Sequence, residues 1–231
     1  MERLSDAMRP FFFRLLFLFV LLISTTSCFE IIEELSLHKD GSGNLQLTLN
    51  ASQSKSKLAS VMLLDTIQGH KVPSKKDIKE HIEELVSDLN ASEGISNVTY
   101  KLNLDSYIVS LSCDFKEVAN INDFVQKLWD KQRSKGTFKS YSFDVGKQLF
   151  SRYYGFKDNL KNSVRSLKDD DKKVLDNASY TLIYRFDNTV KSFSNRTARL
   201  SKSKKAMMMK TPIMDIVSGA STIENKIQLT N

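Results

Sequence analysis

The fold is decided by the stretch IIEELSLHKDGSGNLQLTLN, which spans residues 31–50. Its first part, residues 31–38, is apolar enough for a β-strand, and its last part alternates leucine with polar residues. Asp40 and Gly41 lie between the two parts, and glycine adopts the positive φ that a tight hairpin turn requires. We therefore predict a β-hairpin. Its core face is predicted to carry three leucines: Leu45, Leu47 and Leu49.

Three helices are predicted after this hairpin. Residues 54–68 have a pattern that favours a short helix. Ser74 and Asp77 have the spacing of a capping box and begin a clearer helix. Its apolar stripe is predicted to cover the sheet beside the three leucines, and consists of Ile78, Ile82, Leu85, Val86 and Leu89. A third helix at residues 122–133 is predicted to present Phe124, Val125, Leu128 and Trp129.

The remaining strand-like segments complete the predicted sheet. They are residues 95–104, 107–115, 180–186, 190–193 and 223–229, together with a basic hairpin at residues 196–210. This order of hairpins and helices predicts an α+β fold, with a mostly antiparallel sheet built from hairpins and covered by two or three helices. Cys113 lies on the apolar face of a predicted strand, so we expect a buried and inert thiol.

The N-terminus has the order of a bacterial lipoprotein signal. Two arginines precede an apolar run at residues 15–23, and small polar residues then lead to Cys28. The run is too short to span a bilayer core, which needs about 20 residues. Residues 1–27 are therefore predicted to be a signal peptide, with either Met1 or Met8 as the start.

Cys28 is the expected site of lipid attachment. Acyl chains on this residue would hold the mature domain on a membrane, because each buried methylene contributes about 0.8 kcal/mol. Thr25 stands where the usual signal has an aliphatic residue, so an ordinary cleaved signal is the alternative. Phe29 rather than Asp follows the cysteine, which favours the outer membrane. A dense acidic cluster right after the cysteine would favour export to the cell surface. This chain has only a diluted one, Glu30, Glu33 and Glu34, so we expect the periplasmic face.

Charge is divided unevenly along the mature chain. Residues 29–130 carry 10 Lys and Arg against 16 Asp and Glu, a net charge of −6, whereas residues 131–210 carry 20 against 7, a net charge of +13. Nucleic acid is not expected outside the cytoplasm, so the basic half predicts contact with anionic lipid or lipopolysaccharide. The expected contact residues are Lys202, Lys204, Lys205 and Lys210, with Met207, Met208 and Met209 inserting beside them. A solvated surface without a partner is the alternative.

Three parts of the sequence together resemble a known family. They are the Cys28-Phe29-Glu30 start, the hairpin from Leu35 to Leu45, and the late strand from Leu182 to Phe186 with Val190 after its turn. Here the chain is similar to the LppM-like lipoprotein domains and to uncharacterised envelope lipoproteins of Bacteroidetes. The resemblance implies an envelope lipoprotein with an α+β domain and implies no catalytic residues.

The domain organisation follows from these observations. Residues 28–231 are predicted to form an exported α+β domain. Its first half, residues 29–135, is the LppM-like core, and its second half, residues 136–231, is basic and rich in strands. A polar segment near residues 158–176, which contains three consecutive aspartates, is predicted to be an insertion.

The residue pattern argues against an enzyme. His38, His70 and His81 are scattered, and the sequence has no nucleophile motif, glycine-rich phosphate loop or metal-ligand spacing. No catalytic residue, cofactor or metal is therefore expected. We predict a membrane-tethered envelope lipoprotein with a non-enzymatic binding or structural role. The alternative is a carrier of a hydrophobic or lipid ligand, whose pocket would be lined by Tyr141, Phe143, Phe150, Tyr153, Tyr154 and Phe156.

Overall fold

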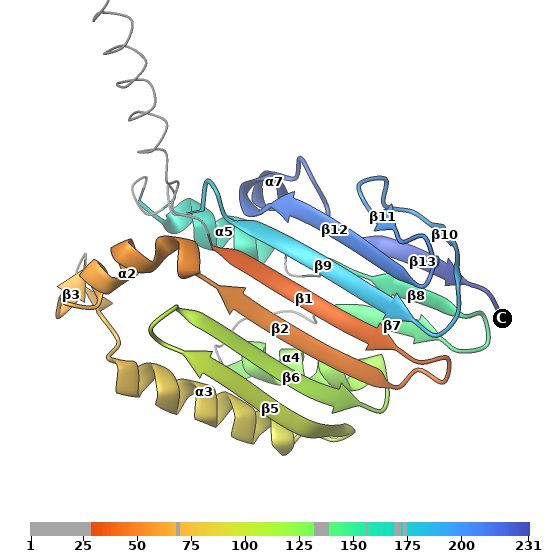
Figure 1. Ribbon diagram of the computed structural model, residues 1–231, viewed down its shortest axis with the longest axis horizontal. Coiled ribbons are helices and arrows are strands. Elements are labelled where there is room, and N and C mark those ends of the chain that lie inside the picture. Colours follow the sequence, from red (N-terminus) through yellow and green to blue (C-terminus); the bar gives the residue numbers. More distant parts are fainter. Residues whose placement is uncertain (1–28, 68–69, 132–138, 156, 169–171, 173–174) are drawn as a thin grey trace, which may run out of the picture.

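The computed structural model describes residues 29–67, 70–131, 139–155, 157–168, 172 and 175–231 (Figure 1). The predicted signal peptide at residues 1–27 and the predicted lipid site Cys28 lie outside the described residues. Phe156 and the three aspartates at residues 169–171 lie outside them as well. The side chains of Leu128 and Trp129 are likewise outside the described part.

A seven-stranded sheet has the order β11-β12-β9-β1-β2-β6-β5 (Figure 1). Its strands are β1 (Glu30–Leu37), β2 (Gly43–Asn50), β5 (Ile95–Asn103), β6 (Ile108–Phe115), β9 (Ser179–Phe186), β11 (Arg199–Leu200) and β12 (Ala206–Pro212). Neighbouring strands are antiparallel except for β1 and β9, which pair in parallel. The α+β class is confirmed. Both predicted halves of the chain contribute strands to this sheet.

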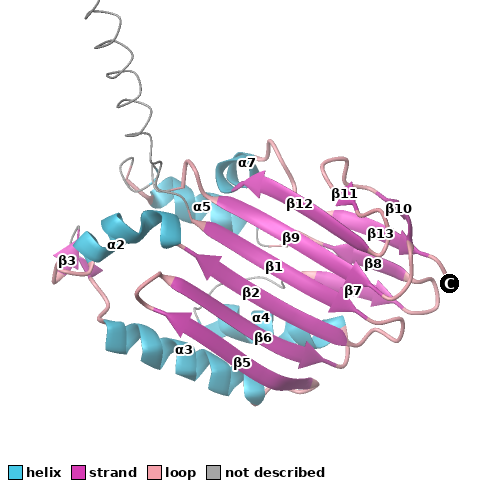
Figure 2. Ribbon diagram, in the orientation of Figure 1, coloured by secondary structure: helices cyan, strands magenta, loops and turns pink. Residues whose placement is uncertain are grey.

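A four-stranded antiparallel sheet packs against one face of the larger sheet, on the side of β9 and β12 (Figure 2). We call this covered face the inner face of the larger sheet. In order, it contains β10 (Val190–Phe193), β13 (Asn225–Leu229), β8 (Leu149–Arg152) and β7 (Tyr141–Asp144). The turn at Asp187 therefore leads from one sheet into the other. A short β3 (Thr66–Ile67) and β4 (His70–Lys71) form a separate two-stranded ribbon.

Helices cover other parts of the inner face and one end of the sheet (Figure 2). They are η1 (Ser52–Ser54), α2 (Lys55–Val61), α3 (Lys75–Asn90), α4 (Val118–Lys131), α5 (Lys157–Ser166) and α7 (Ile213–Ser218). α4 begins at Val118 rather than at residue 122. The reason is local, because the Asn120 side chain accepts a hydrogen bond from the Glu117 N–H at 2.9 Å and so caps an earlier turn. The sequence pattern did not predict α7.

The predicted hairpin and capping box are both present. At the hairpin, Gly41 has a φ of 94°, in the left-handed region that favours glycine. Glycine is required at position 43 for steric reasons, because a Cβ atom there would lie 2.0 Å from the Ser36 carbonyl oxygen. At the start of α3, the Ser74 hydroxyl accepts from the Asp77 N–H at 3.1 Å, and the Asp77 carboxylate accepts from the Ser74 N–H at 2.9 Å.

The centre of the core lies between the two sheets. Leu35 on β1, Phe150 on β8 and Ile227 on β13 are fully buried. The ring of Phe150 meets the rings of Tyr184 and Phe186 edge-on, with centroids 5.3 and 5.8 Å apart. Burying each large apolar side chain contributes about 1.5–3 kcal/mol. The core between the two sheets therefore supplies much of the stability of the protein.

The three leucines of β2 differ in their environments. They face the inner side, because Leu45 pairs directly with the buried Leu35 and the next two leucines follow at two-residue steps. Leu45 packs against the core, whereas Leu47 and Leu49 are 44% and 41% exposed. The prediction of a core position is therefore wrong for Leu47 and Leu49. The four-stranded sheet covers the β9 side of the inner face and leaves this part of β2 open.

Candidate functional site

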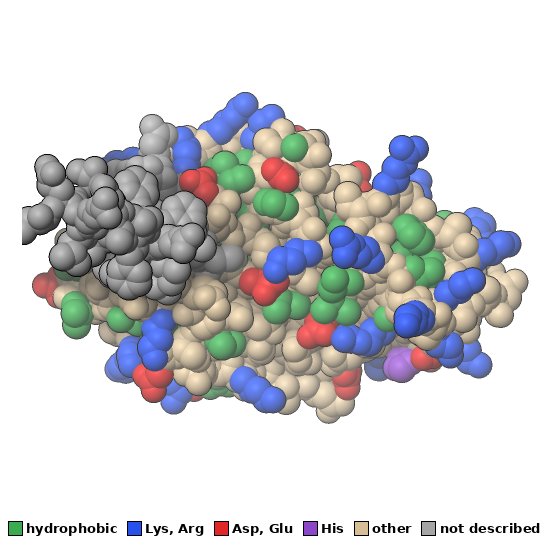
Figure 3. Space-filling model, turned by 45° about the horizontal axis from the view of Figure 1, so that its top comes forward, with side chains coloured by type: hydrophobic (Ala, Val, Ile, Leu, Met, Phe, Trp, Pro, Cys, Tyr) green, Lys and Arg blue, Asp and Glu red, His purple; other side chains and the backbone are tan. Residues whose placement is uncertain are grey.

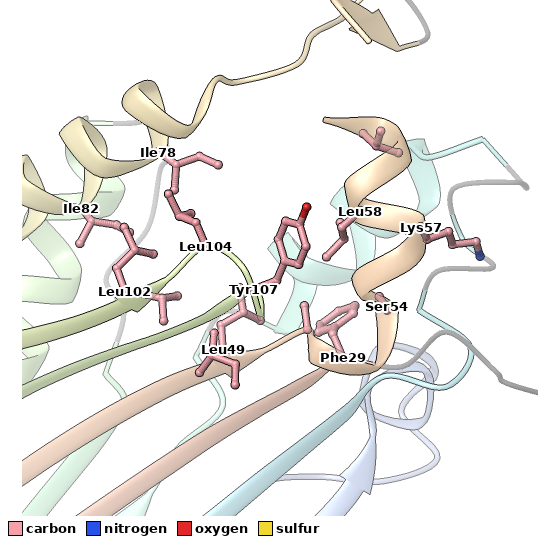
Figure 4. Close-up of a pocket in the computed structure, with 14 residues that line it drawn as sticks. Phe29, Leu49, Ser54, Lys57, Leu58, Ile78, Ile82, Leu102, Leu104 and Tyr107 are labelled. Carbon is pink, nitrogen blue, oxygen red and sulfur yellow. The ribbon is translucent and has the colours of Figure 1, made fainter. Parts of the chain in front are cut away.

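An apolar groove lies between the inner face of the larger sheet and the helices α2 and α3 (Figure 4). Its volume is about 390 Å³. Strands β2, β5 and β6 supply the floor, α3 supplies one wall, and α2 supplies the other. The main lining side chains are aliphatic: Leu49, Leu58, Ile78, Ile82, Leu102 and Leu104. Such a lining suits an apolar ligand.

The apolar stripe of α3 has two roles along the helix. Leu89, near the C-terminal end, is buried, and Leu85 packs against the same core. Ile78 and Ile82, nearer the N-terminal end, are only half-buried and line the groove. The helical period places all four on one face, as predicted. The sequence pattern alone did not show that the first turns of this face border a groove.

Few polar side chains lie at the groove. Tyr107 occupies the turn between β5 and β6 with a φ of 54°, and its carbonyl accepts a hydrogen bond from the Ala51 N–H at 2.9 Å. Its hydroxyl points into the gap between α2 and α3, whereas Lys57 extends away from that gap (Figure 4). The Tyr107 hydroxyl is thus placed to orient the polar end of a bound molecule.

One end of the groove lies where the described chain starts. Phe29 lines the groove, and its carbonyl accepts a hydrogen bond from the Ser179 N–H at 3.0 Å. This bond holds the segment before β1 against β9. Cys28 is the next residue toward the N-terminus, and consecutive Cα atoms are about 3.8 Å apart. The groove therefore reaches the first described residue, which directly follows the predicted lipid site in the sequence.

The aromatic residues predicted to line a pocket do not line this groove. Tyr141, Phe150 and Tyr154 are buried in the core, and Phe143 packs against it. Tyr141 and Phe143 also border a separate cavity of about 310 Å³ with mixed polar and apolar walls. The pocket prediction assigned ligand contact to residues that mainly hold the two sheets together. Their spacing in the sequence does not distinguish these two roles.

A fully buried ion pair joins the two sheets. Arg152 on β8 contacts Glu33 on β1 through two nitrogens, at 3.0 Å from Nη2 to Oε2 and 3.2 Å from Nε to Oε1. The side chains of the two residues are 2% and 3% exposed. The hydroxyls of Tyr180 and Tyr184 donate to the same carboxylate at 2.6 and 3.0 Å. The guanidinium also lies over the ring of Tyr141, 4.8 Å from its centroid.

This network fixes the charges of its members. Burial by itself would raise the pKa of Glu33, but the nearby Arg152 charge and the Tyr180 hydroxyl stabilise the carboxylate and hold its pKa below the usual value. Burial first, and then the Glu33 charge, raise the pKa of Tyr180 and of Tyr184. Glu33 therefore stays charged and both tyrosines stay protonated donors. The network is closed to ligands, and we interpret it as structural.

The three acidic residues after Phe29 all contact partners from the basic half of the chain. Glu30 meets Lys210 at 2.8 Å, Glu34 meets Arg185 at 3.0 Å, and Glu33 is in the buried pair. The pairs of Glu30 and Glu34 form because β1 lies beside β9, with β12 next in the sheet. Lys and Arg side chains are spread over the face seen in Figure 3 and interspersed with acidic ones. The division of charge along the sequence is partly compensated in space.

The four lysines predicted to meet an anionic surface lie in two places. Lys202, Lys204 and Lys205 are exposed in the turn between β11 and β12, whereas Lys210 lies in β12 and pairs with Glu30. The turn is near the last residues of β1 and β9, because β12 runs antiparallel to β9. An eight-residue strand spans roughly 25 Å, so the turn and Phe29 lie at opposite ends of the sheet (Figure 1).

The methionines next to these lysines alternate between the two faces of β12. Met207 and Met209 are 2% and 3% exposed and belong to the core, while Met208 is 42% exposed on the other face. Successive side chains of a strand point to opposite sides, so a run of three cannot all reach one surface. The expectation that all three insert among lipid headgroups is wrong for Met207 and Met209.

Cys113 is buried, as predicted, and burial raises the pKa of its thiol to about 11. The thiol therefore stays protonated and unreactive at neutral pH. His38 lies on the surface, with its Nδ1 atom 3.1 Å from the Asp187 carboxylate. In the part of the chain that the structure describes, no group of His, Cys, Asp and Glu side chains is arranged to hold a metal ion.

No family model and no curated protein sequence matches this chain. One solved structure that is similar to it is the NMR structure of the folded domain of LppM from Mycobacterium tuberculosis. The similarity has a TM-score of 0.42 and 13% sequence identity, and covers 88% of this chain and 91% of that chain. None of the helices formed by the described residues is long and apolar enough to cross a membrane.

Proposed function

We propose that this protein is a non-enzymatic envelope lipoprotein, tethered through Cys28, that binds the apolar part of a lipid or similar hydrophobic molecule. The observation that carries the proposal is the aliphatic groove between α2, α3 and the sheet. Its volume of about 390 Å³ lies within the range of about 300–1,000 Å³ that is usual for ligand pockets. The carrier role, and not only a structural one, is therefore the function that the geometry supports best.

The position of the groove supports the same proposal. Phe29 lines it, so a lipid on Cys28 would bring this end of the domain to a membrane. A bound chain would cover apolar side chains that water now reaches, such as the 41% exposed Leu49. Removing apolar surface from water contributes about 25 cal/mol per Å². The groove would thus gain its affinity from burial and its orientation from the Tyr107 hydroxyl.

The basic turn limits how the domain can sit on a membrane. Lys202, Lys204 and Lys205 lie about one strand length from Phe29. The bilayer that holds Cys28 can also meet this turn only if the long axis of the sheet lies along the membrane. With the domain upright, the turn would instead point toward a second anionic surface in the envelope. We infer this second arrangement, with the outer membrane holding the anchor and the domain on the periplasmic side.

The test uses the fluorescent fatty acid cis-parinaric acid and the mature chain, residues 28–231, with Cys28→Ser. This substitution removes the lipid site and is expected to move the protein from the membrane to the soluble fraction; unchanged membrane partition would contradict the tether. Gently purified Cys28→Ser protein is expected to carry a lipid visible by native mass spectrometry, and to bind the probe once that lipid is removed.

Leu49 and Leu47 offer a matched pair of variants. They lie on the same strand and face and are similarly exposed, but only Leu49 lines the groove. Leu49→Trp is expected to fill the groove and weaken probe binding by about tenfold or more, equivalent to about 1.4 kcal/mol. Leu47→Trp is expected to leave the affinity unchanged. Equal effects of the two substitutions, or no binding by the unsubstituted groove, would refute the proposed site.

A further inference from the structure

Three exposed aliphatic side chains gather at the end of the molecule near Phe29. We call Leu63, Leu64 and Ile67 the aliphatic tip; they are 87%, 50% and 40% exposed. Single exposed apolar residues are normal on proteins, but three large ones within five positions are a local concentration of exposed apolar side chains. The tip lies in the segment from the end of α2 to β3.

The backbone of the tip is hydrogen-bonded. The Leu64 N–H donates to the Val61 carbonyl at 3.0 Å and continues the last turn of α2. At the base, the Val72 N–H donates to the Asp65 carbonyl at 3.0 Å, and the Val72 side chain is buried. Leu63 and Leu64 are therefore held in the turn that follows α2, and Ile67 is held in the ribbon of β3 and β4.

The charges around the tip are mainly positive. Lys55 and Lys57 on α2 and Lys71 on β4 are exposed, and Asp65 is the one carboxylate among the described residues from 55 to 71. Lys71 is 3.9 Å from Asp77 at the start of α3. Aliphatic side chains with lysines in the adjoining elements match the interface of a bilayer that contains anionic lipid, where each cation near the surface contributes about 1 kcal/mol.

The tip, the groove and the start of the described chain share one end of the molecule. Figure 1 shows β3 and α2 at the end where β1 begins, opposite the turn between β11 and β12. Leu58 and Val61 of α2 line the groove, and the tip follows directly after this helix. A membrane that covers the tip therefore also meets the side of the molecule that holds the groove.

We propose that the aliphatic tip inserts into the interface of the same bilayer that holds Cys28. The inference rests on the tether in the proposed function, which brings this end of the domain to a membrane. Insertion of Leu63, Leu64 and Ile67 fixes the orientation of the domain, with the groove next to the lipid headgroups and the lysine turn pointing away. A lipid chain then enters the groove without crossing bulk water.

The test measures the surroundings of a bimane label in the full lipidated protein, reconstituted into vesicles of phosphatidylethanolamine and phosphatidylglycerol. The label is placed at Leu63→Cys or, as a matched control, at Val145→Cys. Val145 is 50% exposed in the turn between β7 and β8, and the neighbouring Gln148 side chain bonds to the Lys39 carbonyl at the far end of β1. Cys113 is buried and is not expected to react.

Brominated lipids are expected to quench the label at Leu63→Cys, and iodide in the water is expected to quench the label at Val145→Cys. Equal access of iodide to both labels would overturn the inference. Protection of the Leu63→Cys label without vesicles, rising with protein concentration, would show a second copy on the tip and would also overturn it.

A second measurement separates this inference from the proposed function. Leu63→Asp with Leu64→Asp is expected to weaken the residual vesicle binding that the Cys28→Ser protein keeps without its tether, and to leave thermal unfolding and binding of cis-parinaric acid unchanged. Val145→Asp is expected to change none of the three. If the tip variants bind vesicles normally while the groove still binds the probe, the inference fails and the groove proposal stands.

Discussion

Replacing Glu33 by Gln tests whether the buried ion pair holds the two sheets together. The substitution keeps the shape of the side chain and removes its charge, so Arg152 stays buried opposite a neutral amide. The contact that is lost is bidentate, at 3.0 and 3.2 Å, and both side chains are almost inaccessible to water. Breaking one partner of such a pair costs about 3–5 kcal/mol, because the remaining charge has no compensation.

The assay is thermal or urea unfolding of the mature chain, residues 28–231, carrying Cys28→Ser. For a protein of this size, each kcal/mol lowers the melting temperature by about 2–4 °C, so Glu33→Gln is expected to lower it by roughly 6–20 °C. Glu34→Gln is the matched control. Its carboxylate pairs with Arg185 at 3.0 Å on the more exposed face, where such pairs contribute about 0–1 kcal/mol.

The same carboxylate predicts a pH dependence. The pKa of Glu33 is lower in the folded protein than its ordinary value of 4.5, so its contribution is fully present above pH 4.5 and is lost as the pH falls through the folded-state pKa. The difference in unfolding free energy between Glu33 and Glu33→Gln proteins is therefore expected to be constant near pH 7 and to shrink in acid.

Two results would refute this reasoning. A cost of Glu33→Gln no larger than that of Glu34→Gln would mean that the pair is solvated. A difference between the Glu33 and Glu33→Gln proteins that persists unchanged far below pH 4.5 would mean that the lost stability does not come from the charge of the carboxylate.

Two further predictions concern the sheet and the basic turn. Leu35→Asp is expected to prevent folding because Leu35 is fully buried, whereas the Leu47→Asp protein is expected to fold because Leu47 is 44% exposed. Circular dichroism and gel filtration measure folding in both variants. Equal outcomes would contradict the difference in burial between Leu35 and Leu47. Changing Lys202, Lys204 and Lys205 to Glu is expected to leave the fold and the tip label unchanged but to stop vesicles that carry the protein from capturing a second, acidic vesicle. That capture should weaken as salt shortens the screening length from about 30 Å at 0.01 M to about 8 Å at 0.15 M. If the second vesicle is not captured, or if its capture does not depend on salt, the turn has no anionic partner.

The local elements were predictable from residue order, because their causes are local. The alternation from Leu45 to Leu49, the positive φ at Gly41 and the reciprocal bonds of Ser74 and Asp77 depend only on nearby residues. Periodicity placed the hairpin, α3 and most strands of the sheet, and so the α+β class. The same patterns also identified Cys113 as a buried residue.

The sequence by itself thus determined which residues form strands and helices and which face of each is apolar. Only the tertiary structure decided what each apolar face meets. Leu35 and Leu49 carry the same pattern, yet the four-stranded sheet buries one and leaves the other at a groove. Glu33 pairs with Arg152, 119 positions away, because the chain places β1 beside β9 and under β8. Contacts between residues so far apart in the sequence depend on how the two sheets pack, and the local pattern of apolar residues does not indicate them.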